Sequence, residues 1–578
     1  MTIFAGVLSL DSKREVPAAV ADDLRRGISR SPGDTPAVHV FPGCVFGVQS
    51  LGLLPGRGTL SDERGVYTLL SGDPLLTARS AGDRDEDLRR LHAAWLDGDD
   101  SLLARTRGSF CAVQVDPVAG RLRMATDKLG ARPLYVCFSG GLVYFSTAIR
   151  ILEGLSTLRL SADLRGQIEA AGFGYSLGTR TRYAGVELMD GGEVIAVSRD
   201  TTMRRQHYWR WSDLQPTRLD ARELPRELYR AFQEAVRWRL GKQSSVLAFL
   251  SGGLDSRVVA ASLLKEGARV HSVNLAPDGT LDLHLGRTLA NRLGTSHFEY
   301  SSGPAEVLER TVAGHAAWLA SIPLSDRPPY PAAAWTGTGG SVGVGNVYLN
   351  DDMVSLLRQG RRVEAVSEFL SFNRIGLPPR AFRRAVRPLA ATCLAEGVLD
   401  QVQTLECFDE GRRLHWFLMM NDQRRHLGAI YESMDKIRLE YINPFFDAEF
   451  LRLLLSAPID SFIGHRFYNA WLKEFPFAID AAAWQAYPGH EPCPLPMPQG
   501  LRDQWTDGWQ SRQGAREVAA LGLAHAEQAL ADPHFPTDVL SKPTMRLAWW
   551  LTRAGFRDYS YLLKIAGAFA SPRSRPNA

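Results

Sequence analysis

The stretch Val246-Leu247-Ala248-Phe249-Leu250-Ser251-Gly252-Gly253-Leu254-Asp255-Ser256 decides the fold of this chain. Five apolar residues in succession predict a buried parallel strand, and Arg257 to Lys265 predicts a helix that ends at Gly267. The Ser-Gly-Gly-Leu-Asp-Ser turn between them brings glycine backbone and two hydroxyls to a helix N-terminus, a favourable place for an anion. Because the carboxylate of Asp255 would repel a bare phosphate, we expect Mg²⁺ to lie between them.

Strand, turn and helix together resemble the pyrophosphate loop of the asparagine synthetase family, whose synthetase half uses ATP to activate a carboxylate. A glycine turn in an unrelated α/β protein is the alternative, and the six-residue match in its strand–helix context argues against it. The resemblance implies ATP and Mg²⁺ as cofactors, with Asp255 as the metal ligand. It implies ATP contacts at Leu250, Ser251, Gly252, Gly253, Asp255, Ser256 and Leu275.

A second glycine-rich stretch, 336–345, lies where the family has its second ATP loop. The resemblance implies that Thr336 and Gly337 contact ATP. Its two acidic positions are replaced here, one by Thr338 and the other, which binds the second Mg²⁺ in the family, by Ser341. Asp351 or Asp352 could supply the missing carboxylate, although 348–357 also predicts a plain helix. Without the first loop, the stretch would indicate only a flexible surface loop.

The segments after the first loop predict a doubly wound parallel sheet. A strand over 268–275, a helix over 281–293 capped by Gly294, and a strand over 297–300 form a βαβαβ run. Such a sheet binds its ligand beyond the carboxyl ends of its strands. Further along, 439–447 resembles the family segment that packs the helical lobe onto the sheet, and we expect most of it in the core.

The first 200 residues predict a layered antiparallel domain, with strands near 4–8, 38–40, 66–70, 110–115, 122–125 and 142–146 and a helix over 85–96. Landmarks at 108–110, 126–135 and 145–148 resemble the family's glutaminase domain, which implies an N-terminal-nucleophile-hydrolase αββα sandwich. Thr2 stands where that domain has its nucleophilic cysteine, and Ser71-Gly72-Asp73 replaces its Asn-Gly-Glu. We expect a retained sheet without glutaminase chemistry; a threonine nucleophile is the alternative.

Three further residues are candidates for catalysis by resemblance. Glu432 lies roughly where β-lactam synthetases place the carboxylate of their base dyad. Arg466, or otherwise Lys473, would stabilise the charge of the acyl-adenylate transition state. The alternative for each is an ordinary charged residue on a helix surface.

Composition excludes several function classes. The 578 residues carry a net charge of +4 with scattered arginines, so nucleic acid is not an expected partner. Six separated cysteines without a C-x-x-C pair argue against a zinc site and disulfides and favour a reducing cytoplasm. Neither a signal peptide nor an apolar run of transmembrane length is present.

We therefore expect an inactive glutaminase-like domain over 1–205 and an amide-forming synthetase domain with a helical C-terminal lobe over 206–578. Because ammonia then has no internal source, the substrate is expected to carry its own amine. The resemblance is greatest to lasso peptide macrolactam synthetases, which implies a precursor peptide as substrate, with a leader peptidase and a leader-binding protein as partners. A β-lactam synthetase and a non-catalytic ATP-binding protein are the alternatives.

Overall fold

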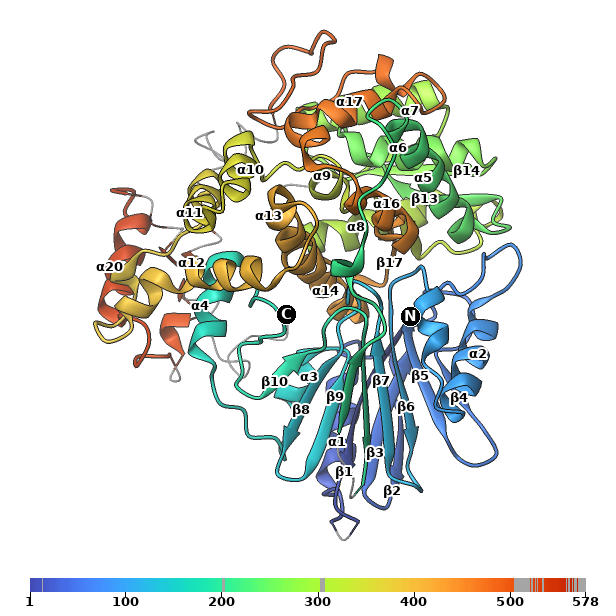
Figure 1. Cartoon of the computed structure of the whole chain (residues 1–578), viewed down its shortest axis with the longest axis vertical. Helices are drawn as coiled ribbons and strands as arrows, with labels where there is room; N and C mark the ends of the chain where they lie inside the picture. Colours follow the sequence, from blue (N-terminus) through green and yellow to red (C-terminus); the bar gives the residue numbers. More distant parts are fainter. Residues whose placement is uncertain are drawn as a thin grey trace. The chain divides into compact units, whose positions relative to one another are not determined.

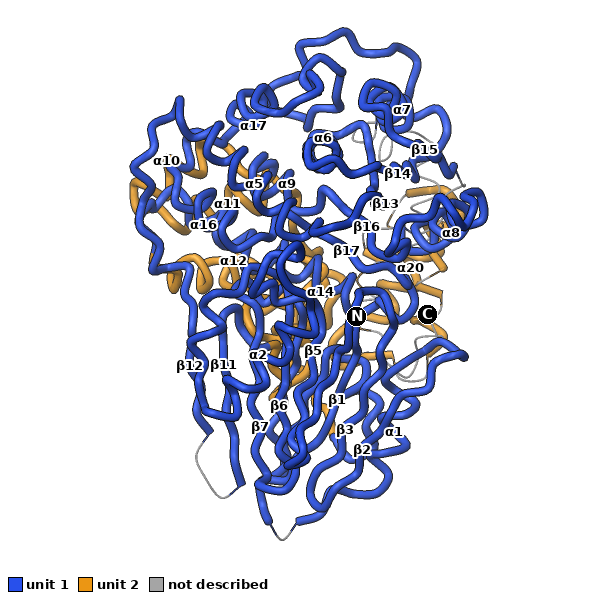
Figure 2. Tube along the Cα trace, turned by 90° about the vertical axis from the view of Figure 1, so that its right-hand side faces the viewer, with its two compact units in different colours: residues 1–158, 189–347, 407–503 blue, residues 159–188, 348–406, 504–578 orange. Residues whose placement is uncertain are grey.

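The structure is a computed structural model that describes residues 1–12, 14–199, 203–301 and 307–503, and of the later chain 520, 523–524, 526–527, 529–532, 535–557, 559, 562–563, 565 and 569. The chain divides into two compact units (Figure 2). Unit 1 comprises residues 1–158, 189–347 and 407–503; unit 2 comprises 159–188, 348–406 and 504–578. The units do not coincide with the domains 1–205 and 206–578, which remain a sequence-based division.

Two antiparallel sheets with helices on their outer faces form the N-terminal part of unit 1 (Figure 1). In the first, the strands run in the order β8-β9-β1-β3-β2, with bounds Tyr135–Ser139, Leu142–Ser146, Thr2–Ser9, Cys44–Ser50 and Ala37–Phe41. The second has the order β12-β11-β7-β6-β5-β4, with bounds Arg204–His207, Glu193–Ser198, Arg121–Thr126, Phe110–Asp116, Tyr67–Gly72 and Thr59–Ser61. Helix α1 (Ala19–Ile28) packs on the first sheet and α2 (Arg84–Leu96) on the second, which confirms the predicted sandwich.

The core of the sandwich follows from strands that are covered on both faces. Every residue of β1 is buried, because one face packs between the sheets and the other lies under α1. Gly47 in β3 lets that helix approach, since a Cβ there would lie 2.3 Å from the Ile28 Cδ1 atom.

A five-stranded parallel sheet forms the rest of the framework of unit 1, in the order β15-β14-β13-β16-β17. The bounds in that order are Ser296–Glu299, Arg269–Asn274, Ser245–Phe249, Ala333–Trp335 and Glu440–Ile442. The chain winds outward from β13 in one direction to β14 and β15, and in the other to β16 and β17. The point where the order reverses therefore lies between β13 and β16, which is where open α/β sheets bind ligands.

Local sequence signals located most of these elements. Helix α7 spans Leu281–Leu293 with Gly294 as its left-handed cap, as predicted. Helix α6 spans Leu254–Lys265, so it begins three residues before the predicted Arg257, because the acidic residue of the turn already belongs to its first turn. The predicted 439–447 core segment contains β17 and ends at the buried Asp447, which accepts hydrogen bonds from Arg107 and Arg239.

Unit 2 is mainly helical. Its elements include α4 (Leu164–Phe173), the short strand β10 (Val186–Leu188), α10 (Asp351–Arg358), α11 (Arg362–Phe372), α12 (Arg387–Thr404) and α20 (Lys542–Arg553). Helices α4 and α12 pack together, and their buried side chains share one core with those of α20. The predicted helical tail beyond α20 lies largely outside the described residues.

All six cysteines are free thiols, in agreement with the sequence. In the described part of the chain, none of the helices combines the length and the apolar character that crossing a membrane requires.

Candidate active site

The turn after β13 forms an anion-binding loop at the start of α6. The Ser251 backbone N–H donates to the Ser256 Oγ atom at 3.0 Å, and the Gly253 N–H donates to the Ser251 Oγ atom at 3.2 Å. These bonds fold the turn tightly over the helix. No side chain caps the first turn of α6, so its N–H groups are available to an anion.

The second glycine-rich stretch lies directly against this loop. A Cβ atom at Gly337 would lie 2.6 Å from the Ser256 backbone nitrogen, and one at Gly340 would lie 2.4 Å from the Asp255 Oδ1 atom. Only glycine permits such an approach. The two glycine-rich stretches, 251–256 and 336–345, thus lie together beyond the carboxyl ends of β13 and β16.

Asp255 lies where the two loops meet. Its carboxylate accepts hydrogen bonds from the hydroxyls of Tyr468 at 2.7 Å and Ser341 at 2.5 Å. The protein enclosing the carboxylate raises its pKa, and the two hydroxyl donors oppose that rise. By the resemblance, Ser341 stands where the family has its second Mg²⁺ carboxylate, so a hydroxyl faces Asp255 at this position.

These residues fit a Mg²⁺ ion held mostly by nucleotide phosphates. Over 1–503, apart from the gaps given above, and at the described positions of the tail, no three His, Cys, Asp or Glu side chains gather as ligands for a metal. Mg²⁺ is commonly bound by one or two carboxylates together with substrate phosphates. Asp255 would be the protein carboxylate of such a site. Asp351 and Asp352, the other candidates, begin α10 in unit 2 and are exposed, and their role stays a prediction.

A hydrogen-bonded chain leads from the second loop along β17. The Thr336 Oγ1 atom donates to the Asn443 Oδ1 atom at 2.8 Å and lies 2.7 Å from the hydroxyl of Thr338. The Asn443 amide in turn donates to the hydroxyl of Tyr431 at 3.1 Å. Thr336 and Asn443 are both buried, so this network fixes the second loop to the end of the neighbouring strand.

The structure adds another carboxylate at the first loop. The Gly252 N–H donates to the Asp282 Oδ1 atom at 2.7 Å, and Asp282 lies in the first turn of α7. Leu250 is buried in the same turn, while Leu275 is half-buried after β14. Their predicted contact with the adenine of ATP stays a prediction. Asp282 was missed because a carboxylate in a first helical turn is common wherever helices begin.

Of the three predicted catalytic residues, Glu432 is bound away from the two loops, and the other two are exposed. Glu432 is half-buried at the end of α14 (Arg424–Glu432), where it accepts from the Tyr135 hydroxyl and from the Ile149 N–H at 3.1 Å. It therefore joins α14 to the first antiparallel sheet, and this geometry does not support it as the base. Arg466 and Lys473 are both exposed, at the start and the cap of α17 (Arg466–Leu472). Their roles stay predictions.

The helical periodicity of α17 indicates another polar residue that faces the site, Tyr468. Phe467, Tyr468, Trp471 and Leu472 form the buried face of the helix, on which the Tyr468 hydroxyl makes a hydrogen bond to Asp255. This hydroxyl reaches Asp255, whereas the cations lie on the opposite face.

A later segment also packs on the first loop. Arg257 is fully buried and donates to the carbonyls of Ile479, Ala482 and Ala483 at 2.7, 2.6 and 2.9 Å. The Gln485 N–H donates to the Gly252 carbonyl at 3.2 Å. These contacts hold 479–485 against the loop.

Two histidines lie beside this segment. His465 is 3% exposed, adopts a left-handed φ of 65°, and stacks on His490 with ring centroids 4.7 Å apart. Burial, aided by the charge of His490, lowers the pKa of His465 to about 3, so its imidazole is neutral at ordinary pH. His490 in turn hydrogen-bonds to the Val347 carbonyl at 3.2 Å.

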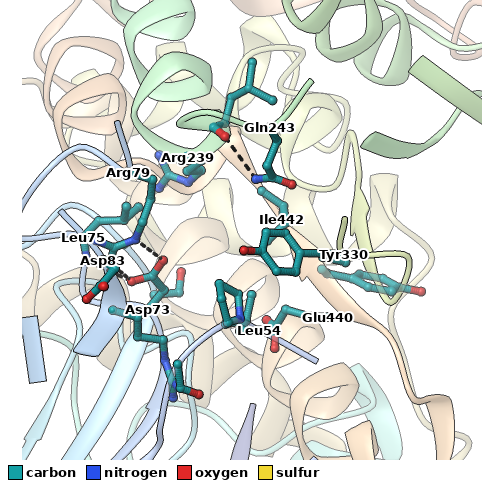
Figure 3. Close-up of a pocket in the computed structure, with 18 of the residues that line it drawn as sticks. Leu54, Asp73, Leu75, Arg79, Asp83, Arg239, Gln243, Tyr330, Glu440 and Ile442 are labelled. Atoms are coloured by element: carbon teal, nitrogen blue, oxygen red, sulfur yellow. Dashed lines mark hydrogen bonds and ion pairs between the residues drawn. The ribbon is translucent and has the colours of Figure 1, made fainter. Parts of the chain in front are cut away.

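Thr2, where the resemblance places the nucleophile of the glutaminase domain, is enclosed by the protein. Thr2 is fully buried, and its Oγ1 atom has no hydrogen-bond partner. A Cβ at Gly58 would lie 1.6 Å from that oxygen, so the adjacent backbone covers it. Asp73 is held by Arg79 at 3.1 Å (Figure 3). This enclosure supports the expectation of a sheet without glutaminase chemistry, which stays a prediction.

Comparison with known proteins agrees with this architecture. Residues 227–335 match the asparagine synthase family, and residues 77–209 match the glutamine amidotransferase domain. The carboxyethyl-arginine beta-lactam synthase of Streptomyces clavuligerus is 27% identical over 307 residues, which cover 49% of this chain and 56% of that protein. The glutamine-hydrolyzing asparagine synthetase of Pongo abelii is 27% identical over 226 residues, covering 36% of this chain and 38% of that protein.

The match thus spans 56% of the length of the first relative and 38% of the length of the second. Among solved structures, a glutamine phosphoribosylpyrophosphate amidotransferase from B. subtilis matches 54% of this chain and 92% of its own, with 9% identity and a TM-score of 0.23, too low to inform the fold. The resemblance to the asparagine synthetase family is confirmed at the level of the two matched domains. The closer resemblance to lasso peptide synthetases stays a prediction.

Proposed function

We propose that this protein is an ATP-dependent amide ligase that activates a substrate carboxylate as its AMP ester and joins it to an amine. The observation that carries the proposal is the meeting of two glycine loops at Asp255, across the point where the strand order of the parallel sheet reverses. An uncapped helix N-terminus, two serine hydroxyls and one carboxylate suit a Mg²⁺–triphosphate.

In the first step, a carboxylate oxygen of the substrate attacks the α-phosphorus of ATP. The bond from that phosphorus to the β-phosphate oxygen breaks, and pyrophosphate leaves. The first turn of α6 and the hydroxyls of Ser251 and Ser256 would bind the departing charge. Mg²⁺ held by Asp255 would supply further neutralisation of the phosphates. Tyr468 and Ser341 orient the carboxylate of Asp255 through their hydrogen bonds.

In the second step, the amine nitrogen attacks the acyl carbon, the acyl–oxygen bond to AMP breaks, and the nitrogen loses one proton. The buried Thr2 supports an amine that is carried by the substrate, because no ammonia would be generated from glutamine. Intramolecular closure also benefits from a high effective concentration of the amine.

For the substrate we propose a precursor peptide, whose N-terminal amine closes on an Asp or Glu side chain to form a macrolactam. Thr338 supports this choice, since the resemblance to the family implies that it stands at a position where β-lactam synthetases carry Tyr. The partners would be a leader peptidase and a leader-binding protein. The similarity to carboxyethyl-arginine beta-lactam synthase favours the second candidate, closure of a small β-amino acid.

The test is ATP–pyrophosphate exchange, which reports adenylation independently of amide formation. With a leader-cleaved precursor peptide as substrate, we expect exchange, release of AMP, and a product lighter by one water. Asp255→Asn should abolish exchange while Asp278→Asn, at an exposed position, should not. Release of ADP would refute the proposal, and AMP formed only with a small β-amino acid would establish the second candidate. Exchange at the wild-type rate by Asp255→Asn would show that the loop has another role.

A further inference from the structure

Helix α20 (Lys542–Arg553) of unit 2 has one face in the core and another in solvent (Figure 1). Its buried residues, Met545 and Ala548, pack in the core that α20 shares with α4 and α12. On the opposite side Leu547 is 58% exposed and Trp550 is 55% exposed. A helix that only closes a core carries polar residues on its outer face, so these large apolar side chains indicate a second contact.

A third apolar side chain joins these two. Phe556 lies just beyond the helix and is 74% exposed, and its ring stacks on that of Trp550 with ring centroids 6.0 Å apart. Leu547 precedes Trp550 by three positions, so the two are neighbours on the helix surface. Leu547, Trp550 and Phe556 therefore form one contiguous surface, the α20 patch. Contiguous apolar patches mark interaction sites, whereas single exposed apolar residues do not.

Cations surround the α20 patch. Segment 539–557 contains no Asp or Glu. Arg546 and Arg553 stand four positions before and three positions after Trp550, so helical spacing places the three side chains on one face. Arg557 lies just beyond the helix, and all three arginines are exposed. The outer face of α20 is therefore apolar at its centre and positive at its margin.

A second basic segment lies against the start of α20. Phe382 and Leu540 form an antiparallel bridge, and the Arg383 N–H donates to the Val539 carbonyl at 2.9 Å. Segment 369–395, which contains one side of this bridge, also has no Asp or Glu. Its exposed arginines beside the bridge are Arg380, Arg383 and Arg384. The fold thus adds cations from a distant part of the sequence to those of α20.

The positive charge of this surface is not balanced within the described part of unit 2. The ion pairs there engage other arginines, such as Arg165 with Asp400 and Arg361 with Glu364. Among the described residues, the cations around the α20 patch have no carboxylate partner. An exposed surface of one sign attracts a partner of the opposite sign, over roughly 8–10 Å at physiological salt.

The surface of an anionic lipid bilayer offers both complements that this face requires. Lipid phosphates attract arginine and lysine, and the acyl boundary beneath them takes up leucine and aromatic side chains. Tryptophan in particular is enriched at the level of the headgroups, because its ring is amphipathic. Three exposed apolar side chains with a positive margin match this layered environment.

Other occupants use less of the α20 patch. A second copy of the chain, related by a twofold axis, would bring the same arginines face to face. A nucleic acid would bind the cations and stack its bases on aromatic rings, but Trp550 and Phe556 already stack on each other. Leu547 would have no role in either complex, whereas a bilayer buries all three apolar side chains.

We propose that the α20 patch and the cations around it bind the surface of an anionic lipid bilayer, with Trp550 and Phe556 inserted at the level of the headgroups. This inference goes beyond the proposed ligase and does not rest on it, because the residues involved belong to unit 2 and their contact with lipid requires neither ATP nor a substrate.

Cosedimentation of the full chain with lipid vesicles tests the proposal. One set of vesicles is phosphatidylcholine alone, and the other contains about one quarter phosphatidylglycerol. We expect binding to the anionic vesicles to be at least about tenfold tighter, and to weaken as salt screens the headgroups. Equal binding to both sets, or binding to neither, would overturn the proposal. Binding of polyuridylate in place of the anionic vesicles would assign the surface to nucleic acid and would overturn it as well.

Two variants locate the contact. The double variant Trp550→Ser with Phe556→Ser should weaken binding to the anionic vesicles at least about tenfold, since two rings no longer insert. Val118→Ser removes a 79% exposed apolar side chain from unit 1 and should leave binding unchanged. Arg546→Glu should weaken binding at least about fivefold. Its control, Arg89→Glu on the exposed side of α2, makes the same change in net charge and should have little effect.

The substituted residues are exposed, so the variants are expected to fold, which circular dichroism checks. Should the double variant fail to fold, Leu547→Ser replaces it, with an expected loss of about fivefold. Wild-type binding by the folded variants, or equal losses in the variants and their controls, would place the lipid contact elsewhere and refute the proposal.

Discussion

Replacing Gly337 by alanine tests whether the contact between the two loops is required for adenylation. Gly337 lies where the second loop touches the N-terminus of α6. An alanine Cβ would lie 2.6 Å from the Ser256 nitrogen and 2.7 Å from the carbonyl carbon of Asp255. The φ of Gly337 is not among the positive values, so the substitution introduces a steric conflict and no backbone strain.

The size of the effect follows from these distances. Ordinary carbon contacts are about 3.5–4.0 Å, so the loops must separate by roughly 1 Å. The atoms in the way are backbone atoms, which cannot rotate aside as a side chain could. Overpacking of this kind costs about 1–3 kcal/mol of stability. A displacement of about 1 Å at a reacting centre costs on the order of 10²-fold in rate.

The assay is ATP–pyrophosphate exchange, with thermal unfolding measured in parallel. The matched control is Gly343→Ala in the same stretch, where the nearest atom to a Cβ is the Leu454 Cδ2 at 3.6 Å. This control adds the same methyl group in ordinary contact, and alanine also favours the short helix α9 (Gly340–Gly343). We expect exchange to fall about a hundredfold in Gly337→Ala and to stay within about twofold in the control.

Two results would refute the reasoning. Wild-type exchange in Gly337→Ala would mean that the loops separate during turnover and that their contact has no role. Equal losses in both variants would mean that the whole stretch is sensitive, whatever the distance to Asp255.

Three further predictions concern positions away from that contact. Thr2→Val should raise the unfolding temperature by removing a buried hydroxyl without a partner, and should leave product formation unchanged; lost product would implicate the hydroxyl in chemistry. Arg257→Met should abolish exchange and lower the free energy of unfolding, measured in urea, by roughly 3 kcal/mol, because buried carbonyls lose their donor; a stable, active variant would contradict this. Burial lowers the pKa of His465 to about 3. Between pH 6.5 and pH 3 the imidazole is therefore protonated in the unfolded chain but neutral in the folded one. Acidification in this window thus lowers the free energy of unfolding by about 1.4 kcal/mol per pH unit. Unfolding at pH 7 and pH 5 should show a smaller acid loss in His465→Gln than in the exposed control His284→Gln, and equal losses would mean that His465 is hydrated in the folded state.

The sequence by itself determined the strand, the turn and the helix that make up the first loop. An apolar run followed by Ser-Gly-Gly-Leu-Asp-Ser specifies strand, turn and helix through interactions between near neighbours in the chain. The range of α7 and its Gly294 cap followed for the same reason. The sequence also predicts, by resemblance, that Thr2 replaces the cysteine of the glutaminase domain; Thr2 is the first residue of β1.

Only the tertiary structure decided which side chains surround Asp255. Tyr468 reaches it from 213 residues away, and Asn443 reaches Thr336 across 107 residues. Sequence spacing indicates which residues share a helix face, but it does not specify what that face packs against. Glu432 and Arg466 were therefore predicted from their positions in the sequence alone. In the folded chain Glu432 binds to the sandwich, and Arg466 is exposed.

The buried ion pair between Arg132 and Glu440 is a property of the same kind. Arg132 and Glu440 are 308 residues apart, and each alone predicts nothing more than a charged residue near a strand. Their burial as a pair, with one donor and one acceptor left over, arises because the sandwich and the parallel sheet pack around them. Local sequence encodes strands, turns and helices through short-range forces, whereas the enclosure of charge depends on contacts that exist only once the whole chain has folded.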